Sequence, residues 1–401
     1  MIKNIFATLL LTFALSAAAP TLAAENIQAQ NTAAESSHLT HVVLFVPADQ
    51  GFPFWDKLAA ISTLAADAFD IDLEVIYGLN NRFLNIQAAQ SVSQRTENKP
   101  DYVLLNVYLN SAKSAMTALN NQGISFITIN ADVEPSERPK VGYPQGRFTG
   151  WLASVMPDDV TAGYLSADYL IDQARQQNLF ASDGLLHIAG LSGGRDTLPS
   201  QQRERGLRSV LSEQADTTLK QMAYADWEQE RASYLTSALL QRHPQVKAIW
   251  AASDMMALGA ASAIRNRGLQ PGKDILLAGT DWTAEGMQAI RSGELLASSG
   301  GHFLDVVLAL AIIYDNEHGV KIAAEKADIL RPMNLLTKDN IDLYWPVLNE
   351  DGWQNLNFLN LSRFYNKDLQ EYPQDTFGLM DLLLQEQPGK TAVSDDSKPA
   401  E

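Results

Sequence analysis

The sequence predicts an α/β protein of two Rossmann-like lobes, each built on a parallel sheet. Short runs rich in β-branched residues alternate with stretches in which apolar residues recur every three or four positions. This alternation is typical of right-handed βαβ units. The 401-residue chain also exceeds what one hydrophobic core usually fills, so we expect two lobes.

The first 24 residues have the order of a secretory signal peptide. Lys3 precedes an apolar run from Ile5 to Ala19, and small residues precede Glu25. The run is shorter than the roughly 20 residues that cross a bilayer, so we expect a cleaved signal and a periplasmic protein. Residues 25–38 and 387–401 are polar without apolar periodicity, which predicts disordered ends.

The composition excludes several classes of binding partner and of chemical site. The sequence has no cysteine, which excludes disulfides, thiolate metal sites and a lipid-modified cysteine after the signal. Its net charge of −17 argues against nucleic acid and anionic membranes, since both bind basic faces. The six histidines are scattered, and no nucleophile motif is present. We therefore expect no metal, no cofactor and no catalytic residues.

Eight β-rich runs are predicted strands. They are residues 41–46, 73–76, 102–105, 126–129, 185–189, 246–250, 275–278 and 295–298. After Pro53 the apolar residues from Phe54 to Ala65 are three and four positions apart, which predicts a helix with proline in its first turn.

Polar and aromatic residues gather directly after the predicted strands. In open α/β sheets, ligands bind beyond the carboxyl ends of the strands, so these positions are the candidate site. They comprise residues 49–55, Asn130, residues 192–195, Asp226 with Trp227, Ser253 with Asp254, and Asp281 with Trp282.

Five short motifs in order resemble the ribose-binding type of periplasmic binding proteins. They are Phe52-Pro53-Phe54-Trp55, Arg203-Glu204-Arg205-Gly206, Ala225-Asp226-Trp227, the run from Ser253 to Gly259, and Ala278-Gly279-Thr280-Asp281. The resemblance extends from about His41 to Pro332. It implies a monomer whose lobes, residues 39–157 plus 302–331 and residues 158–301 plus 332–340, are joined by three crossings near residues 157, 301 and 331.

The resemblance also implies roles for individual residues. Phe54, Trp55 and Trp227 correspond to rings that stack on a bound sugar. Arg203 and Asp281 correspond to groups that bind its hydroxyls, Asn130 stands where an aspartate is common, and Ser253 replaces an asparagine. Ala131, Phe52 and Gly301, with His302 beside it, depart from the ribose pattern. These exchanges favour a ligand larger or less hydroxylated than a pentose. The candidate ligand-binding residues are Phe52, Phe54, Trp55, Asn130, Arg203, Trp227, Ser253, Asp281 and His302.

Each candidate also has a purely structural interpretation. Phe54 and Trp55 suit a helix core, and Trp227 suits a surface ring. Arg203 could pair with Glu204, and Asp281 could cap the following helix. Of Ser253 and Asp254, we expect one to cap a helix and the other to contact ligand. Trp282 and Arg195 are weaker candidates. The glycines from 190 to 194 lack the lysine-serine ending of a phosphate loop.

Residues 341–386 form an aromatic-rich extension beyond the resemblance, which we expect to pack on the lobes. It contains the aromatic run Ser362-Arg363-Phe364-Tyr365-Asn366 and is loosely similar to the extension of the periplasmic receptor for a furanosyl autoinducer, which acts on a membrane sensor kinase. The sequence thus predicts a sugar-binding protein that delivers its ligand to a membrane ABC permease. One alternative is a receptor for a membrane sensor. Another is a carbohydrate-active enzyme, because the separation of two catalytic carboxylates depends on the three-dimensional structure and cannot be read from the sequence.

Overall fold

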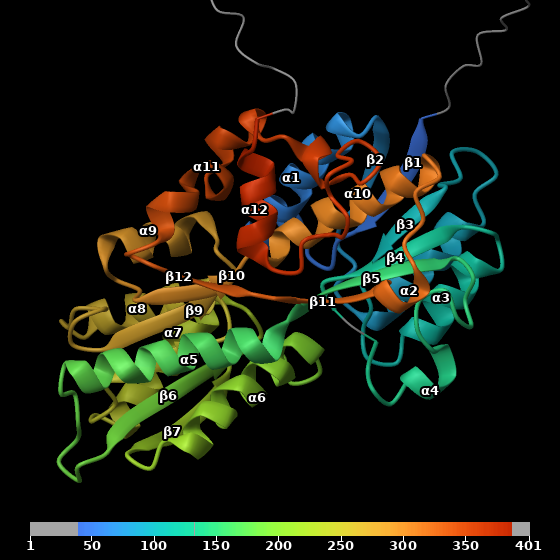
Figure 1. Ribbon diagram of the computed structural model, residues 1–401. Helices are drawn as coiled ribbons and strands as arrows, with labels where there is room; N and C mark the ends of the chain where they lie inside the picture. The colour runs from blue at the N-terminus through green and yellow to red at the C-terminus, as the bar shows by residue number, and fades with distance from the viewer. Residues whose placement is uncertain (1–38, 132, 387–401) are drawn as a thin grey trace, which may run out of the picture. The chain divides into compact units, whose positions relative to one another are not determined.

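The computed structural model describes residues 39–131 and 133–386, and it confirms the α/β class (Figure 1). The expectations for the signal peptide, for residues 25–38 and for the tail from 387 fall outside these residues. Two six-stranded sheets form, ordered β11-β5-β4-β3-β1-β2 and β12-β10-β9-β8-β6-β7. None of the helices in the described part of the chain is both long and apolar enough to cross a bilayer.

We call the first sheet and its helices the N-terminal lobe. All strand pairs in its sheet are parallel. The strands are β1 (Thr40–Phe45), β2 (Ile71–Ile76), β3 (Tyr102–Leu105), β4 (Ser125–Ile129), β5 (Trp151–Asp158) and β11 (Asp328–Pro332). The helices are α1 (Pro53–Ala68), α2 (Arg82–Ser93), α3 (Ala112–Asn120), α4 (Arg138–Val141), η1 (His302–Leu304), α10 (Asp305–Glu317) and η2 (Ala324–Lys326).

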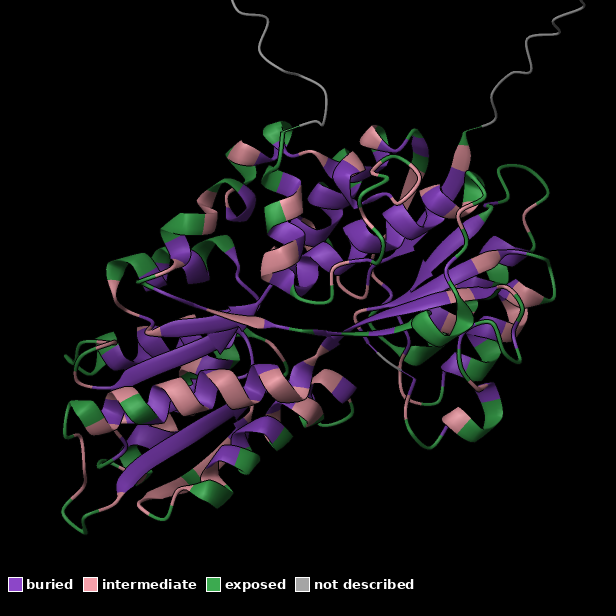
Figure 2. Ribbon diagram, in the orientation of Figure 1, coloured by how far each residue is buried: buried purple, intermediate pink, exposed green. Residues whose placement is uncertain are grey.

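The alternation of side chains along its strands divides this lobe into two cores. Val42 and Leu44 of β1 pack in the cluster that includes α1 and α10, whereas Val43 and Phe45 pack in the cluster that includes α2 and α3. Successive strand residues face opposite sides, so the sheet is covered on both faces. Figure 2 shows its strands as largely buried.

We call the second sheet and its helices the C-terminal lobe. Its strands are parallel except β12, which is antiparallel to β10. The strands are β6 (Leu186–Ser192), β7 (Thr217–Tyr224), β8 (Ala248–Ala251), β9 (Leu276–Thr280), β10 (Ala297–Gly300) and β12 (Asn334–Thr337). The helices are α5 (Asp159–Gln176), α6 (Leu198–Glu213), α7 (Gln229–Arg242), α8 (Asp254–Asn266) and α9 (Ala284–Ser292).

The chain passes between the sheets three times. It leaves β5 at Asp158 for α5, leaves β10 at Gly300 for η1, and leaves β11 at Pro332 for β12. Four strands, β5, β7, β11 and β12, were not among the eight predicted from β-rich runs. β5 contains Pro157, β7 is a half-buried edge strand, and β11 alternates buried and exposed residues, so none reads as a continuous apolar run.

The extension after β12 consists of short helical segments. They are η3 (Ile341–Tyr344), α11 (Trp345–Leu348), η4 (Glu350–Asn355), η5 (Phe358–Leu361) and α12 (Thr376–Leu384). Asp315 of α10 is fully buried and attaches this extension to the N-terminal lobe. Its carboxylate accepts hydrogen bonds from the Ser362 hydroxyl at 2.5 Å, the backbone N–H groups of Arg363 and Phe364, and the Tyr372 hydroxyl at 2.7 Å.

We predict that Asp315→Ala lowers the free energy of unfolding by about 2–4 kcal/mol, because it leaves buried donors of the extension unpaired. Urea unfolding measures the loss, and limited proteolysis should show new cleavage within residues 341–386. Asp381→Ala, an exposed carboxylate of α12, is the matched control. Equal stabilities of the two variants would contradict the anchoring role of Asp315.

Candidate functional site

A cavity of about 630 Å³ lies at the carboxyl ends of strands from both lobes. In the N-terminal lobe its lining comes from the segments after β1, β2, β3 and β4, and in the C-terminal lobe from those after β6, β7 and β9. His302, in the crossing after β10, also lines it. Eight of the nine candidate residues line it: Phe52, Phe54, Trp55, Asn130, Arg203, Trp227, Asp281 and His302. The ninth, Ser253, is not among the lining residues.

Several lining residues have a backbone conformation that non-glycine residues rarely adopt. The φ angles are +62° at Asn130, +50° at Asp226, +69° at Trp227 and +116° at Asp281. Such conformations are strained for residues with a side chain and concentrate at functional sites. Here they occur directly after β4, β7 and β9, where the chain turns out of the sheet towards the cavity.

Arg203 is the buried charge at the centre of the site. Its Nε donates to Asp159 at 2.7 Å, and its Nη1 donates to Asp281 at 2.9 Å and to the carbonyl oxygen of Ala252 at 2.7 Å. Glu204, the partner considered from the sequence, instead accepts hydrogen bonds from Arg208. Nη2 of Arg203 lies 3.4 Å from Nε2 of His302, so Arg203 is held mostly by protein groups and one N–H of Nη2 remains for a ligand.

Two glycines let α5 and α6 approach closely enough for this pairing. A Cβ atom on Gly163 would lie 2.0 Å from the carbonyl oxygen of Arg203, and one on Gly206 would lie 2.1 Å from that of Val160. No larger residue fits without moving a backbone. The glycine of the Arg203-Glu204-Arg205-Gly206 motif thus serves helix packing that brings Arg203 to Asp159.

The carboxyl group of Asp281 has an altered affinity for protons. Burial raises the pKa of Asp281 to about 6, and the nearby Arg203 opposes this shift. Burial and the charges of Arg203 and Lys57 lower the pKa of His302 well below its usual range. His302 is therefore neutral at pH 7. Its ring stacks on Phe54 at 4.4 Å between centroids, and its buried Nδ1 has no partner among the described residues.

The aromatic candidates fall into two groups. Phe54 is buried against Trp55 and His302 in the N-terminal half of the site, so it belongs both to the core and to the cavity wall. Trp227 belongs to the other lobe and packs on Gly193, where an added Cβ would lie 2.1 Å from its ring. The glycines from 190 to 194 thus include one that makes room for an aromatic ring at the cavity.

Sequence reasoning missed several lining residues. They are Asn80, Asn106, Tyr108, Asp196 and Glu228. Asn106 is only 2% exposed, and its amide nitrogen has no hydrogen-bond partner in the described part of the molecule. Asn106 and Tyr108 follow β3, so the strand-end rule that identified Asn130 would have found them.

Other candidates have structural roles. The Ser253 hydroxyl caps α8 by accepting the N–H of Met256, and the Asp254 carboxylate accepts from Ser298 at 2.6 Å and from the N–H of Thr283 at 2.9 Å. Ser253 thus has the capping role expected for one of this pair. Neither residue lines the cavity, and a ligand contact from Asp254 stays a prediction. Trp282 is fully buried, and Arg195 lies over the ring of Tyr224.

The cavity lining is acidic. It contains the carboxylates of Asp49, Asp196, Asp226, Glu228 and Asp281, against the single guanidinium of Arg203. Asp226 is paired with Arg231, which lies outside the lining. Within residues 39–131 and 133–386, no cluster of three histidines or acids is placed to hold a metal ion. The geometry suits a ligand that offers hydroxyl groups and apolar ring faces and carries no negative charge.

Comparison with known proteins gives a consistent result. The family model described as periplasmic binding protein domain matches residues 43–305. The D-allose-binding periplasmic protein of Escherichia coli is 27% identical over 202 residues, which are 50% of this chain and 60% of that protein. A xylitol-binding protein of Mycolicibacterium smegmatis is 24% identical over 68% of this chain and 71% of its own length.

A solved structure extends the similarity to more of the chain. A periplasmic sugar-binding protein from Pseudomonas fluorescens superposes with a TM-score of 0.76 at 28% identity, over 86% of this chain and 100% of its own. A galactofuranose-binding protein, at 16% identity and a TM-score of 0.64, shares the fold over 75% of this chain.

We predict that the carboxyl group of Asp254 makes stability depend on pH. Burial, and then the charge of Asp281, raises its pKa to about 7 in the folded protein. An unfolded aspartate titrates near 3.9, so between about pH 4 and pH 7 the folded state holds a proton that the unfolded state has lost. The stability contributed by this proton is complete below pH 4 and disappears as the pH rises through 7.

Compared with Asp254→Asn, the wild type should therefore lose on the order of 3 kcal/mol of unfolding free energy between pH 4.5 and pH 8. Urea unfolding of both proteins at the two pH values measures this difference, in which the acids that do not interact with Asp254 cancel. Asp381→Asn, on an exposed carboxylate, should follow the wild type. Parallel curves for wild type and Asp254→Asn would contradict the assigned shift.

Proposed function

Because the chain belongs to the periplasmic binding protein family, we propose that it is a binding protein that holds a neutral sugar or polyol in the cavity between its lobes. The observation that carries this proposal is the lining of the cavity. Aromatic rings and polar groups with free hydrogen-bonding capacity come from both lobes and face one space.

The free polar groups define how a ligand would be held. Nη2 of Arg203, the amide of Asn106 and Nδ1 of His302 are buried and have unused capacity. A hydroxyl-bearing ligand satisfies such groups, whereas leaving each unpaired costs about 1–3 kcal/mol. Trp227 from one lobe and Trp55 from the other supply ring faces for the C–H surface of a sugar. Binding would thus draw the two lobes together.

We propose that the two lobes close on the ligand and that the closed protein delivers it. Residues 39–157 plus 302–331 and residues 158–301 plus 332–340 move as two bodies about the three crossings. The monomer acts in the periplasm and delivers its ligand to the membrane permease of an ABC importer. Names of relatives such as the ribose import binding protein of Escherichia coli support this role. A membrane sensor protein is the alternative receiver, and co-purification with either membrane protein decides between them.

We propose that binding is not followed by turnover. The family consists of binding proteins, and the central carboxylates Asp159 and Asp281 are both occupied by Arg203. An acid that holds a buried arginine is not free to protonate a leaving group. Stoichiometric release of sugar from a glycoside panel by the purified protein would promote the carbohydrate-active enzyme instead.

We predict that neutral ligands bind and anionic ones do not. Calorimetry with D-allose, D-ribose, xylitol and myo-inositol should identify at least one ligand. The uronate of any hexose that binds should bind at least about tenfold more weakly, because an added negative charge meets the acidic lining. Equal affinity for a neutral sugar and its uronate would contradict the charge argument. A complete lack of binding across the panel would contradict the proposed function.

We also predict that Trp227→Ala weakens binding of the neutral ligand by about 1–3 kcal/mol while the fold persists, because stacking area is lost. Tyr234→Ala is the matched control. Tyr234 belongs to the same lobe, is 74% exposed and does not line the cavity. Calorimetry on both variants measures the difference, and small-angle scattering with and without ligand reports closure. Unchanged affinity in Trp227→Ala would remove this ring from the site.

A further inference from the structure

Lys57 is a buried amine without an acidic partner in the described part of the chain. It lies on α1, the helix that begins with Phe54 and Trp55, and is only 3% exposed. Its Nζ donates to the backbone carbonyl of Trp282 at 2.8 Å and to that of Leu348 at 3.1 Å, and it lies 4.2 Å from the ring centroid of Phe303. No carboxylate in residues 39–131 and 133–386 forms an ion pair with it.

If Lys57 served packing alone, burying its amine would lower the stability of the fold without a compensating benefit. Burial lowers its pKa to about 7, although Glu350, Asp254 and Glu285 act in the opposite direction. An apolar side chain of similar length would fill the same space without desolvating an amine. The two carbonyl groups are what an apolar side chain could not satisfy.

The two carbonyl groups belong to different parts of the molecule. Trp282 directly follows Asp281, and both have positive φ angles, +116° and +56°, so this turn is strained. Leu348 ends α11 in the extension, beyond the residues matched by the family model. Phe303, over which Nζ lies, belongs to the segment that crosses between the lobes. Lys57 therefore contacts both lobes, one crossing and the extension.

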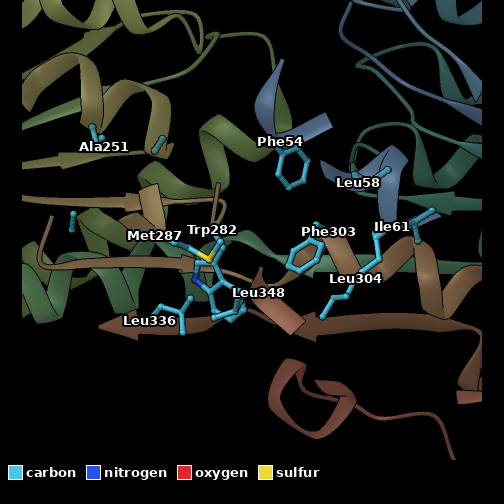
Figure 3. Packing of buried hydrophobic residues seen from close by; sticks show 14 of the residues in the cluster. Phe54, Leu58, Ile61, Ala251, Trp282, Met287, Phe303, Leu304, Leu336 and Leu348 are labelled. Carbon is cyan, nitrogen blue, oxygen red and sulfur yellow. The ribbon is translucent and has the colours of Figure 1, made fainter. Parts of the chain in front are cut away.

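The extension also packs on the ring of Trp282. The indole N–H donates to the carbonyl oxygen of Ser298 at 2.7 Å, and the ring stacks on Phe377 of α12, which in turn stacks on Tyr344. Gly300 leaves room for this ring, since an added Cβ would lie 2.6 Å from it. Figure 3 shows Trp282, Leu348 and Phe303 in one packed cluster.

We propose that Lys57 is a positioning residue for the ligand site: by holding the carbonyl groups of Trp282 and Leu348, it fixes the strained turn that presents Asp281 and makes the extension part of that site. Its effect on the ligand passes through the backbone of Trp282, because Lys57 does not line the cavity. The ligand part of this inference rests on the proposed function, whereas the effect on the turn does not.

Hydrogen exchange tests the effect on the turn without any ligand. The amide of Asp281 donates to the carbonyl oxygen of Ser299, and that of Thr283 donates to Asp254, so both report on this turn. In Lys57→Met these two amides should exchange at least about tenfold faster. The amides of Val43 and Leu44 in β1 should be unchanged. Ser62→Ala, a buried polar change on the same helix, should leave the turn unchanged.

Unchanged exchange at Asp281 and Thr283 would overturn the proposal, and so would a uniform acceleration across both lobes. If Lys57→Met does not fold, Lys57→Gln replaces it. The glutamine amide keeps two donors but is one bond shorter, so only the turn amides should exchange faster. A folded Lys57→Gln with unchanged turn amides and a lower melting temperature would overturn the proposal as well.

A double-mutant cycle tests the effect on the ligand, with a neutral sugar or polyol from the panel that the wild type binds. Lys57→Met should weaken binding about tenfold in the wild type but less than about twofold in the Asp281→Ala background, because it acts by placing Asp281. Equal losses in both backgrounds would overturn this route. If the wild type binds no member of the panel, the proposed function fails, and the exchange experiment still decides the role of Lys57.

Discussion

The site depends on the pairing of Arg203 with two carboxylates. A buried guanidinium without a partner destabilises a fold by several kcal/mol. The helix and strand ends that carry its partners must therefore lie next to Arg203. Asp159 begins α5, Asp281 follows β9, and the carbonyl of Ala252 follows β8. One side chain thereby joins the start of a helix to two strand ends. The glycine contacts between α5 and α6 exist because this pairing needs short helix separation.

The same pairing determines what remains for a ligand. Asp159 and Asp281 share the guanidinium of Arg203, and burial raises the pKa of Asp281 above the usual value for an aspartate. Nη2 of Arg203, Nδ1 of His302 and the amide of Asn106 are left with capacity. The proposed site would therefore select its ligand through hydrogen bonds and ring faces. The acidic lining adds a penalty for anions without adding a specific contact.

Much of the fold and half of the site follow from local sequence. The strand-end rule located Asn130 and Asp281 because each follows a short apolar strand, and parallel sheets bring those ends together. Trp227 follows the half-buried strand β7, which was not predicted, and its role rested on the resemblance. Local sequence could not decide whether Ser253 caps a helix or contacts the ligand, because a serine before a helix suits either role. The partners of Arg203 and Lys57 lie 44 or more residues away, so only the tertiary fold reveals them. Strands with proline or with one polar face were missed because their apolar pattern is broken.

The extension has two kinds of attachment, and they differ in how much movement they permit. On the N-terminal lobe, four hydrogen bonds converge on the buried carboxylate of Asp315, a geometry that tolerates little displacement. On the C-terminal lobe, ring contacts such as Phe377 on Trp282 and the exposed ion pair of Arg291 with Asp342 tolerate sliding and contribute little energy. In the proposed closing motion the extension therefore moves with the N-terminal lobe. Lys57 of the N-terminal lobe also holds the backbone of Trp282, so in this motion only the ring contact of Phe377 on Trp282 slides, next to the proposed ligand contact Asp281.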